Sequence, residues 1–466
     1  MRKNPRAQTH ITSDRIDADM PTPLRLQGTM LTTLRLQGFK NFRDATLALG
    51  PLTLLVGTNA AGKSNVRDAF RFLHGIGRGY TLAEIIGEKW GEGGVLQWRG
   101  IRGGTREVAF EGRTDFSLYV EFLALYPKEI LDERLPPDGS IGGGGAYFIN
   151  VEVGDNGKPA KVTRERLTFR SLTVFDSHPP DDPILTVPPD PDHLPVRLMM
   201  GASQRGSYGQ KLNCLSLRPA LAQVAENAKA RDVRLYAKMV LDGLQSMRFL
   251  DLDPEALRRP SLPGQTVLGD KGENLSSVLQ AICTKPDLKA ALASWIAELT
   301  PMDATDFDFP ADQQGRILVN LVEKSGGHIS AYSASDGTLR FLAMIAALLG
   351  PESSRFYFFE ELDNGIHPAR LHLLLGLIER QAERGTVQMV ATTHSPELLA
   401  LLDRKSLENA SLVYRLPGSN EGRIVRILDI PGAADLIAQQ DLAKLHSTGW
   451  LEDAVYFSAA PGEAAQ

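Results

Sequence analysis

The sequence predicts an α/β protein with three parts: a parallel-sheet core that carries a phosphate loop, a mixed-sheet lobe, and an inserted helical region. Three observations support this fold class. A glycine-rich motif follows an apolar run and precedes an amphipathic pattern, strand-like and helix-like segments alternate after residue 317, and helical periodicity dominates residues 210–300. Alternating strands and helices are typical of a largely parallel sheet that is covered on both faces.

The composition is that of an ordinary globular chain. Of its 466 residues, 42% are apolar and 23% are charged, and the formal net charge is −5. With this net charge, the protein as a whole does not attract nucleic acid electrostatically, although a local basic patch is compatible with the composition. The two cysteines, Cys214 and Cys283, are too few for a disulfide framework or a cysteine zinc site. No apolar run approaches the ~20 residues that span a bilayer, so we expect a cytoplasmic protein without a membrane partner.

The N-terminal segment, residues 1–29, is polar and has no clear periodicity. The sequence Leu-Arg-Leu-Gln-Gly occurs at 24–28 and again at 34–38, and only the second copy continues into a strand-like run toward the glycine motif. We therefore expect Met30 to be the functional start and residues 1–29 to be a disordered extension. An added edge strand is the alternative.

Residues 30–196 are assigned to the first lobe. Strands are expected at Thr32–Leu36, at Thr46–Val56 and near 106–125. Residues 127–195 hold 11 of the 28 prolines and a run of four glycines at 142–145. Such a composition favours long surface loops with short strands between them.

The motif at Gly57–Ser64 reads Gly-Thr-Asn-Ala-Ala-Gly-Lys-Ser, which fits the pattern G-x-x-x-x-G-K-[ST]. The apolar run Leu52–Val56 before it predicts a buried strand. After it, Val66, Ala69, Phe70 and Leu73 fall on one helix face. A strand, a glycine turn and a helix in this order are the context in which this pattern binds nucleotides.

Each residue type in this loop has a physical role. Gly57 and Gly62 let the backbone wrap around a phosphate, while Lys63 and the helix N-terminus supply positive potential. The hydroxyl of Ser64 is suited to hold Mg²⁺. The expected ligands are therefore a nucleotide and Mg²⁺.

Residues 197–310 are expected to form the inserted helical region. Leu217–Leu250 and Leu275–Leu299 have amphipathic patterns, but the segment lacks the sustained heptads of a long coiled coil. Residues 197–259 contain eleven Lys and Arg against six Asp and Glu. This excess either contacts nucleic acid or an acidic partner, or is simply a charged helix face.

Residues 311–430 are assigned to the second lobe. Helices at 338–349 and 368–384 alternate with strands at Arg355–Phe359 and Thr386–Ala391. Pro368 stands at a helix start and Gly385 just beyond its end, as helix capping expects. The final segment, residues 431–466, carries scattered apolar residues that either pack on this lobe or dock a partner.

Three further motifs follow the phosphate loop in a fixed order. Ser335 and Gly337 lie at the mouth of an apolar helix, which is a second phosphate-binding device. An apolar strand ends in Glu360 and Glu361, which would place one acid near Mg²⁺ and the other beside the attacking water. A third strand ends in His394, which can reach a γ-phosphate. Each motif is weak alone, but their order behind a phosphate loop is specific.

With these motifs, the chain resembles the ABC-type ATPase heads of the SMC, RecF and OLD kind, and more closely the stand-alone prokaryotic AAA-family ATPases found in anti-phage operons. Gly57–Asn65 matches their G-x-N-x-x-G-K-S-N pattern, which includes Asn59 and Asn65. Ser335–Thr338 matches their signature motif, Glu360–Pro368 their extended Walker B motif, and Thr393–Ser395 their switch histidine. The resemblance covers residues 31–430 and implies an ABC-ATPase head.

The resemblance also implies roles for these residues. Lys63 and Ser64 would bind the phosphates and Mg²⁺, Glu361 would orient or deprotonate water, and His394 would sense the γ-phosphate. Ser335 and Gly337 would come from a second copy, so ATP would drive homodimerisation. The sequence departs from the family pattern in two places. The metal-side acid, usually Asp, is Glu360, and no evident motif marks the glutamine that contacts the metal, for which Gln97 is the candidate.

The biological role has two main interpretations. The first is a sensor or scaffold that switches a separately encoded effector in anti-phage defence. Only 36 residues follow Ile430, and they contain no run of acidic ligands such as a nuclease domain would need. The second is a DNA repair or chromosome-maintenance ATPase that binds double-stranded DNA. A non-catalytic nucleotide-binding module is a third, which the presence of Lys63, Glu361 and His394 disfavours.

Overall fold

The computed structural model describes residues 28–133, 141–154, 157–170, 172–179, 190, 192–198, 209–299, 304–350, 355–366, 368–383, 385, 387–394, 398, 401–402, 404–439 and 450–458. The expectations for residues 1–27 and for the tail residues 440–449 and 459–466 lie outside this part of the chain. Among the helices described, none combines the length and the apolar character that a bilayer crossing requires.

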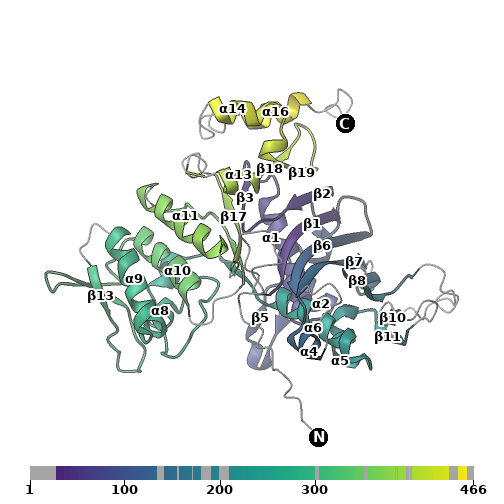
Figure 1. Ribbon diagram of the computed structural model, residues 1–466, viewed down its shortest axis with the longest axis horizontal. Helices are drawn as coiled ribbons and strands as arrows, with labels where there is room; N and C mark the ends of the chain where they lie inside the picture. Colours follow the sequence, from purple (N-terminus) through teal and green to yellow (C-terminus); the bar gives the residue numbers. More distant parts are fainter. Residues whose placement is uncertain are drawn as a thin grey trace, which may run out of the picture.

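An eight-stranded antiparallel sheet forms one side of the molecule (Figure 1). Its strands, in spatial order, are β11 (Lys211–Leu215), β10 (His193–Leu198), β9 (Leu172–Asp176), β8 (Lys161–Phe169), β7 (Gly142–Glu152), β6 (Asp115–Leu125), β1 (Met30–Phe39) and β2 (Phe42–Ala48). Helices α5 (Ala220–Asn227) and α6 (Arg231–Gln245) contribute to the hydrophobic core on this sheet.

A six-stranded sheet forms the centre of the fold. Its order is β12 (Met247–Leu250), β16 (Phe356–Phe359), β17 (Gln388–Thr393), β3 (Leu52–Val56), β18 (Ala410–Arg415) and β19 (Gly422–Arg426). All neighbouring pairs are parallel except β18 with β19. The predicted α/β fold class with a largely parallel core sheet is confirmed, while the sheet of the separate lobe, predicted to be mixed, is antiparallel throughout.

Both faces of this central sheet are covered, and β16 shows how. The Phe70 ring of helix α1 (Lys63–Gly77) lies 5.0 Å from the Phe356 ring and 5.9 Å from the Phe358 ring. Tyr357 and Phe359 point to the opposite core, which they share with helices α10 (Asp336–Leu349) and α11 (Pro368–Glu383). A strand buried on both faces is continuously apolar, as this one is.

The described part of the chain has further helices and strands. They are α2 (Leu82–Ile86), β4 (Lys89–Trp90), η2 (Glu92–Gly94), β5 (Leu96–Trp98), α3 (Gly104–Glu107), α4 (Lys128–Glu133), α7 (Pro254–Leu257), α8 (Leu275–Cys283), α9 (Pro286–Leu299), β13 (Ala304–Asp308), β14 (Asn320–Glu323), β15 (His328–Ser330), α13 (Arg404–Glu408), η3 (Ile427–Asp429), α14 (Ala433–Gln439) and α16 (Trp450–Ser458). In Figure 1, α8, α9, α10 and α11 group on the side away from the antiparallel sheet.

The predicted phosphate-loop strand, the helix after it and the helices near 338–349 and 368–384 are confirmed. The expected strand Thr46–Val56 was wrong as one element. Gly50 and Pro51 separate β2 from β3, which belong to different sheets, because proline cannot donate to a central ladder.

The expectation of loops over 127–195 was also wrong for the described residues, since β7 and β8 span eleven and nine residues. The glycine run begins β7 and pairs with β6. A Cβ on Gly145 would lie 2.5 Å from the Phe122 ring, so the absence of a side chain lets that ring pack against the strand.

The two long helical patterns also divide in the structure. The helical pattern predicted to end at Leu250 is helical only as far as Gln245. Its last residues form β12 of the core sheet. The pattern Leu275–Leu299 is two helices, because Pro286 begins a new one. In the tail, Leu451 and Val455 are buried in the core of the second lobe, so these residues pack on the head.

Glu165 on β8 is fully buried and joins the sheet to helix α5. Its carboxylate accepts hydrogen bonds from the Tyr147 hydroxyl at 2.9 Å and from the backbone N–H groups of Ala220 at 2.6 Å and Leu221 at 2.7 Å. Burial raises the pKa of Glu165 to about 7, although these hydrogen bonds lower it. The folded protein therefore binds more protons than the unfolded chain between the ordinary carboxyl pKa and 7.

We expect the contribution of Glu165 to stability to decline as pH rises through this window, because ionisation in the core becomes necessary. Glu165→Gln should remove that decline, and Glu165→Ala should destabilise the fold by about 2–4 kcal/mol, since it leaves three buried donors unpaired. Urea unfolding at pH 5 and pH 7.5 measures both effects. Equal pH dependence in the wild type and Glu165→Gln would contradict the prediction.

Candidate nucleotide-binding site

The phosphate loop connects the end of β3 to the start of α1 and is shaped by left-handed backbone. Gly57 has φ 144°, Gly62 has φ 127°, and even Ala60 has φ 62°. A Cβ on Gly57 would lie 2.0 Å from the carbonyl oxygen of Val413, so only glycine fits beside β18. Helix α1 begins at Lys63, directly after the loop, and the N-terminus of a helix is a favourable place for an anion.

Lys63 is held inside this loop. Its ammonium group donates to the carbonyl oxygens of Gly57 and Thr58, the latter at 2.9 Å, and its Nζ lies 3.5 Å from Nδ1 of His394. Burial lowers the pKa of Lys63 to about 8, while the charge of Glu361 raises it. A phosphate oxygen can replace the carbonyl partners, and the lysine is therefore positioned for an anion before one binds.

A cavity of about 450 Å³ opens over this loop, and it brings together residues from both halves of the chain. The predicted site residues that line it are Asn59, Gly62, Lys63, Ser64, Asn65, Glu360, Glu361 and His394. Sheet topology explains their convergence. β3, β16 and β17 are parallel, so the residues that follow each strand meet at one edge.

Glu361 follows β16 in an unfavourable backbone conformation. Its φ is 49°, in the left-handed region that costs a residue other than glycine about 1 kcal/mol. Its N–H donates to the Thr392 hydroxyl at 2.9 Å, which ties it to the neighbouring strand β17. Asn364 donates to the Glu361 carboxylate, also at 2.9 Å. The fold thus holds this exposed carboxylate toward the cavity at a conformational cost, as is common at functional sites.

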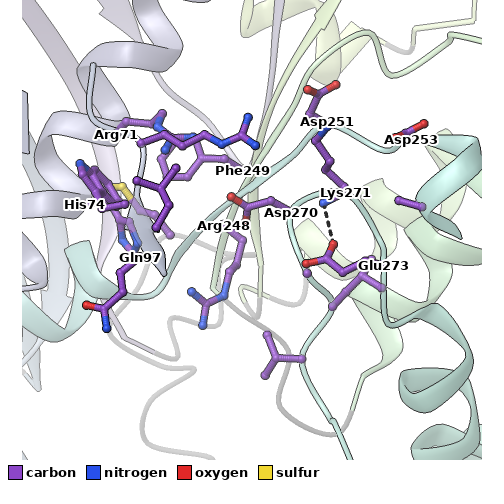
Figure 2. A pocket seen from close by; sticks show the side chains of 18 of the residues that line it. Arg71, His74, Gln97, Arg248, Phe249, Asp251, Asp253, Asp270, Lys271 and Glu273 are labelled. Atoms are coloured by element: carbon purple, nitrogen blue, oxygen red, sulfur yellow. Dashed lines mark hydrogen bonds between the residues drawn. The ribbon is translucent and has the colours of Figure 1, made fainter. Parts of the chain in front are cut away.

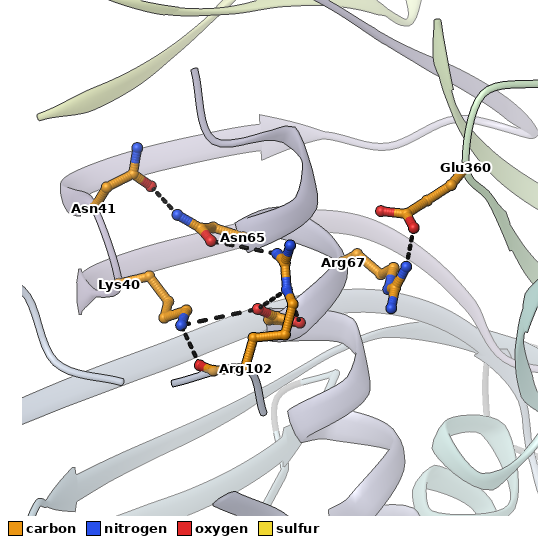
Figure 3. Close-up of polar contacts among 7 residues, drawn as sticks. Lys40, Asn41, Asn65, Arg67, Arg102 and Glu360 are labelled. Atoms are coloured by element: carbon orange, nitrogen blue, oxygen red, sulfur yellow. Dashed lines mark hydrogen bonds and ion pairs between the residues drawn. The ribbon is translucent and has the colours of Figure 1, made fainter. Parts of the chain in front are cut away.

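Glu360 forms an ion pair with Arg67 of α1 (Figure 3). Its N–H also donates to the Leu250 carbonyl, which fixes the end of β16 against β12. The Ser64 hydroxyl and the Glu360 carboxylate supply the oxygen ligands that Mg²⁺ prefers, so the residues present fit that ion. In this arrangement Arg67 and a bound Mg²⁺ would compete for the Glu360 carboxylate.

A second polar network supports the loop from the side of the first lobe (Figure 3). Arg102, which lines the cavity, donates to buried Asp68 at 3.0 Å. Asn65 donates to Asn41 at 2.7 Å, and Asn41 donates to the Ala61 carbonyl at 3.1 Å. The asparagines therefore brace the loop, and Arg102 adds a second positive charge near Lys63.

Sequence reasoning missed Asn41, Arg102 and Arg340. Asn41 lies with Lys40 in the turn between β1 and β2, and this turn was the available signal. Arg102 had none. Arg340 is one turn into α10, lines the cavity and donates to the Asn364 carbonyl at 3.1 Å. It had a signal, because it lies two residues after the signature motif Ser335–Thr338.

Three predicted residues lie elsewhere. Ser335 caps α10 by accepting a hydrogen bond from the Thr338 N–H and is exposed, and neither it nor Gly337 lines the cavity. A Cβ on Gly337 would lie 2.2 Å from the Gly365 carbonyl oxygen. Gln97 lines a separate cavity, so the structure does not bring this candidate metal ligand to the site. The matched positions His367 and Ser395 fall outside the described residues.

Comparison with known proteins connects this geometry to a family. The model of the family described as "AAA domain, putative AbiEii toxin, Type IV TA system" matches residues 52–123 and 169–400, which include the phosphate loop, Glu361 and His394. The chain belongs to this AAA-domain family. The unmatched stretch between the two ranges holds β7 and most of β8, in the antiparallel sheet.

Individual relatives are distant from this AAA-domain protein. It is 33% identical over 127 residues to the chromosome partition protein Smc of Xanthomonas oryzae pv. oryzae. The matched region covers 26% of this chain and 10% of the relative, so it spans about a tenth of that protein's length. Among solved structures, an Smc head bound to the C-winged helix domain of ScpA is 13% identical with a TM-score of 0.46, and the match covers 85% of this chain and 97% of that one. An Smc head from Pyrococcus furiosus bound to the C-terminal domain of ScpA is 12% identical with a TM-score of 0.42, covering 88% and 99%.

Proposed function

We propose that this AAA-domain protein binds ATP with Mg²⁺ and hydrolyses it. The observation that carries the proposal is the convergence of Lys63, Glu361 and His394 in one cavity at the edge of the parallel sheet. A cation, a carboxylate and an imidazole beside a phosphate loop are the groups that phosphoryl transfer to water uses.

The residues divide the work between them. Lys63 and the loop N–H groups bind the β- and γ-phosphates, and Arg102 and Arg340 add charge at the cavity wall. Glu361 orients a water molecule and accepts its proton, while His394 contacts the γ-phosphate. Ser64 and Glu360 would hold Mg²⁺, which would neutralise part of the phosphate charge.

Ser335 and Gly337 complete the site from a second copy of the chain in this proposal. Both lie at the N-terminus of α10, outside their own cavity, and Ser335 is exposed. ATP would therefore join two chains head to tail, and hydrolysis would separate them. This two-state arrangement acts as a switch. The proposed partner is a separately encoded effector in cytoplasmic anti-phage defence.

Replacing Ser335 by arginine tests the dimer. We expect ATP to increase the mass of the wild-type protein to that of a dimer in light scattering, and Ser335→Arg to stay monomeric while it still binds ATP. Ser325→Arg, the same change at an exposed turn between β14 and β15, is the matched control. A dimer of Ser335→Arg, or a wild type that stays monomeric with ATP, would overturn the proposed assembly.

A DNA-dependent ATPase is the second candidate, favoured by the sequence similarity to a chromosome partition protein. The steady-state hydrolysis rate with and without double-stranded DNA separates the two. Stimulation by DNA that disappears as salt rises would support the DNA-dependent role. A rate that is indifferent to DNA would support a switch that a protein activates.

A further inference from the structure

A second, larger cavity lies beside the nucleotide site (Figure 2). Its volume is about 860 Å³, and it is bounded by α1, β5, β12 and the segment from 251 to 273. Seven cationic side chains line it against four acidic ones. Cavities of this size are typical of sites for small molecules, and this excess of positive charge indicates an anionic ligand.

Two arginines in this cavity have incomplete hydrogen bonding. In the described part of the chain, neither Arg71 nor Arg248 makes a hydrogen bond or an ion pair, and the Nε atoms of both are buried without an acceptor. Arg71 is held by packing, with its guanidinium 5.0 Å from the Trp98 ring centre and 5.6 Å from that of Phe249. A buried N–H group without an acceptor is costly, and a bound anion would supply that acceptor.

Asp270 is the internal counter-charge. It lies between Arg71 and Arg248 in Figure 2. Burial raises the pKa of its carboxyl group, although the charges of Arg71 and Arg248 lower it. A single carboxylate that is itself poorly solvated does not neutralise two guanidinium groups. The Asp270 carboxylate also repels a bound anion. Replacing Asp270 by a neutral residue should therefore strengthen anion binding.

The cavity contacts the nucleotide site through two residues. Asp251 lines both cavities, and Arg67 lines the larger one while its guanidinium pairs with Glu360. An anion that attracts Arg67 would compete with Glu360 for it. Occupancy of the larger cavity would then release the carboxylate that fits Mg²⁺.

We propose that this cavity is a second ligand site, which binds a small polyphosphate anion up to the size of a nucleoside triphosphate through Arg71 and Arg248. Its occupant regulates the ATPase through Arg67. The regulatory step rests on the proposed function, whereas the binding step does not.

Calorimetry on the full-length Lys63→Ala protein tests the binding step, because this variant lacks the lysine of the phosphate loop. The probes are inorganic tripolyphosphate and, separately, the non-hydrolysable ATP analogue AMP-PNP. We expect saturable binding of about one anion per chain. Arg71→Gln and Arg248→Gln should each weaken it about tenfold or more, while Asp270→Asn should tighten it. Arg106→Gln, at an exposed position outside the cavity, is the control and should change nothing.

The outcomes separate the alternatives. If tripolyphosphate and AMP-PNP both bind, the site recognises the phosphate groups. If AMP-PNP binds and tripolyphosphate does not, the site recognises a nucleotide. Absence of saturable binding by both probes, or binding that persists in the Arg71→Gln Arg248→Gln double variant, would overturn the site. Binding of a single-stranded oligonucleotide without either small anion would overturn it as well. The phosphate-loop proposal fails separately, if wild type and Lys63→Ala hydrolyse ATP equally.

Discussion

Lys63→Ala is expected to remove one bound nucleotide per chain and to lower ATP hydrolysis by about 100-fold or more. The ammonium group is already inside the loop, 2.9 Å from the Thr58 carbonyl and 3.5 Å from His394, so the loss leaves the phosphates without their central cation. Charge-assisted hydrogen bonds to phosphate are the strong ones, and a loss of about 3 kcal/mol corresponds to this factor. Calorimetry with Mg-ATP gives the stoichiometry, and phosphate release gives the rate.

The pKa of Lys63 adds a pH dependence to this result. Because burial lowers that pKa to about 8, the lysine is largely charged at pH 7 and largely neutral at pH 9. Binding at pH 9 must therefore take up a proton, so we expect wild-type affinity for ATP to fall between these values. Lys229→Ala, an exposed lysine on the surface, serves as the control. Unchanged stoichiometry and rate in Lys63→Ala would show that the loop does not bind the nucleotide.

Glu361→Gln is expected to lower hydrolysis by about 100-fold or more while leaving ATP bound. Glutamine has the same shape and retains an oxygen that accepts the hydrogen bond from Asn364, so the strained backbone at this position is preserved. Glutamine cannot accept a proton from water, and the loss of a general base lowers the hydrolysis rate by about 100-fold or more. The ATP-bound dimer should then accumulate in light scattering, because the step that opens it is blocked.

Glu360→Gln distinguishes the two neighbouring acids. It breaks the ion pair with Arg67 and weakens a ligand suited to Mg²⁺, so its main effect should be a higher Mg²⁺ requirement. Glu361→Gln should leave the Mg²⁺ requirement unchanged. A Glu361→Gln protein that turns over at the wild-type rate would remove this residue from the catalytic role.

Much of the core could be predicted because local patterns specify it. The run Leu52–Val56 is apolar throughout, the glycines after it allow left-handed backbone, and the helix that follows has one apolar face. Strand β16 is apolar throughout for the same reason as β3, which is burial on both faces. Where burial and backbone conformation depend on near neighbours in the chain, the sequence contains the necessary information.

Other elements could not be predicted, because their structure depends on distant partners. The Gly142–Gly145 run has the composition of a loop, yet β6 pairs with it and Phe122 packs where side chains would stand. The residues of β12 continue a helical pattern, but pairing with β16 makes them a strand. Gln97 belongs to the segment where a metal-contacting glutamine was expected, and the fold carries it to the larger cavity.

The sequence by itself determined the family, the phosphate loop and eight of the nineteen residues that line the nucleotide cavity, since these depend on short motifs and on the order of strands in a parallel sheet. Only the tertiary structure decided that Arg67 pairs with Glu360, that Arg102 and Arg340 reach the same cavity, and that Arg71 and Arg248 line a second one. Electrostatic partners are chosen by proximity in space. Residues separated by hundreds of positions become neighbours only when strands from distant parts of the chain pair in the central sheet.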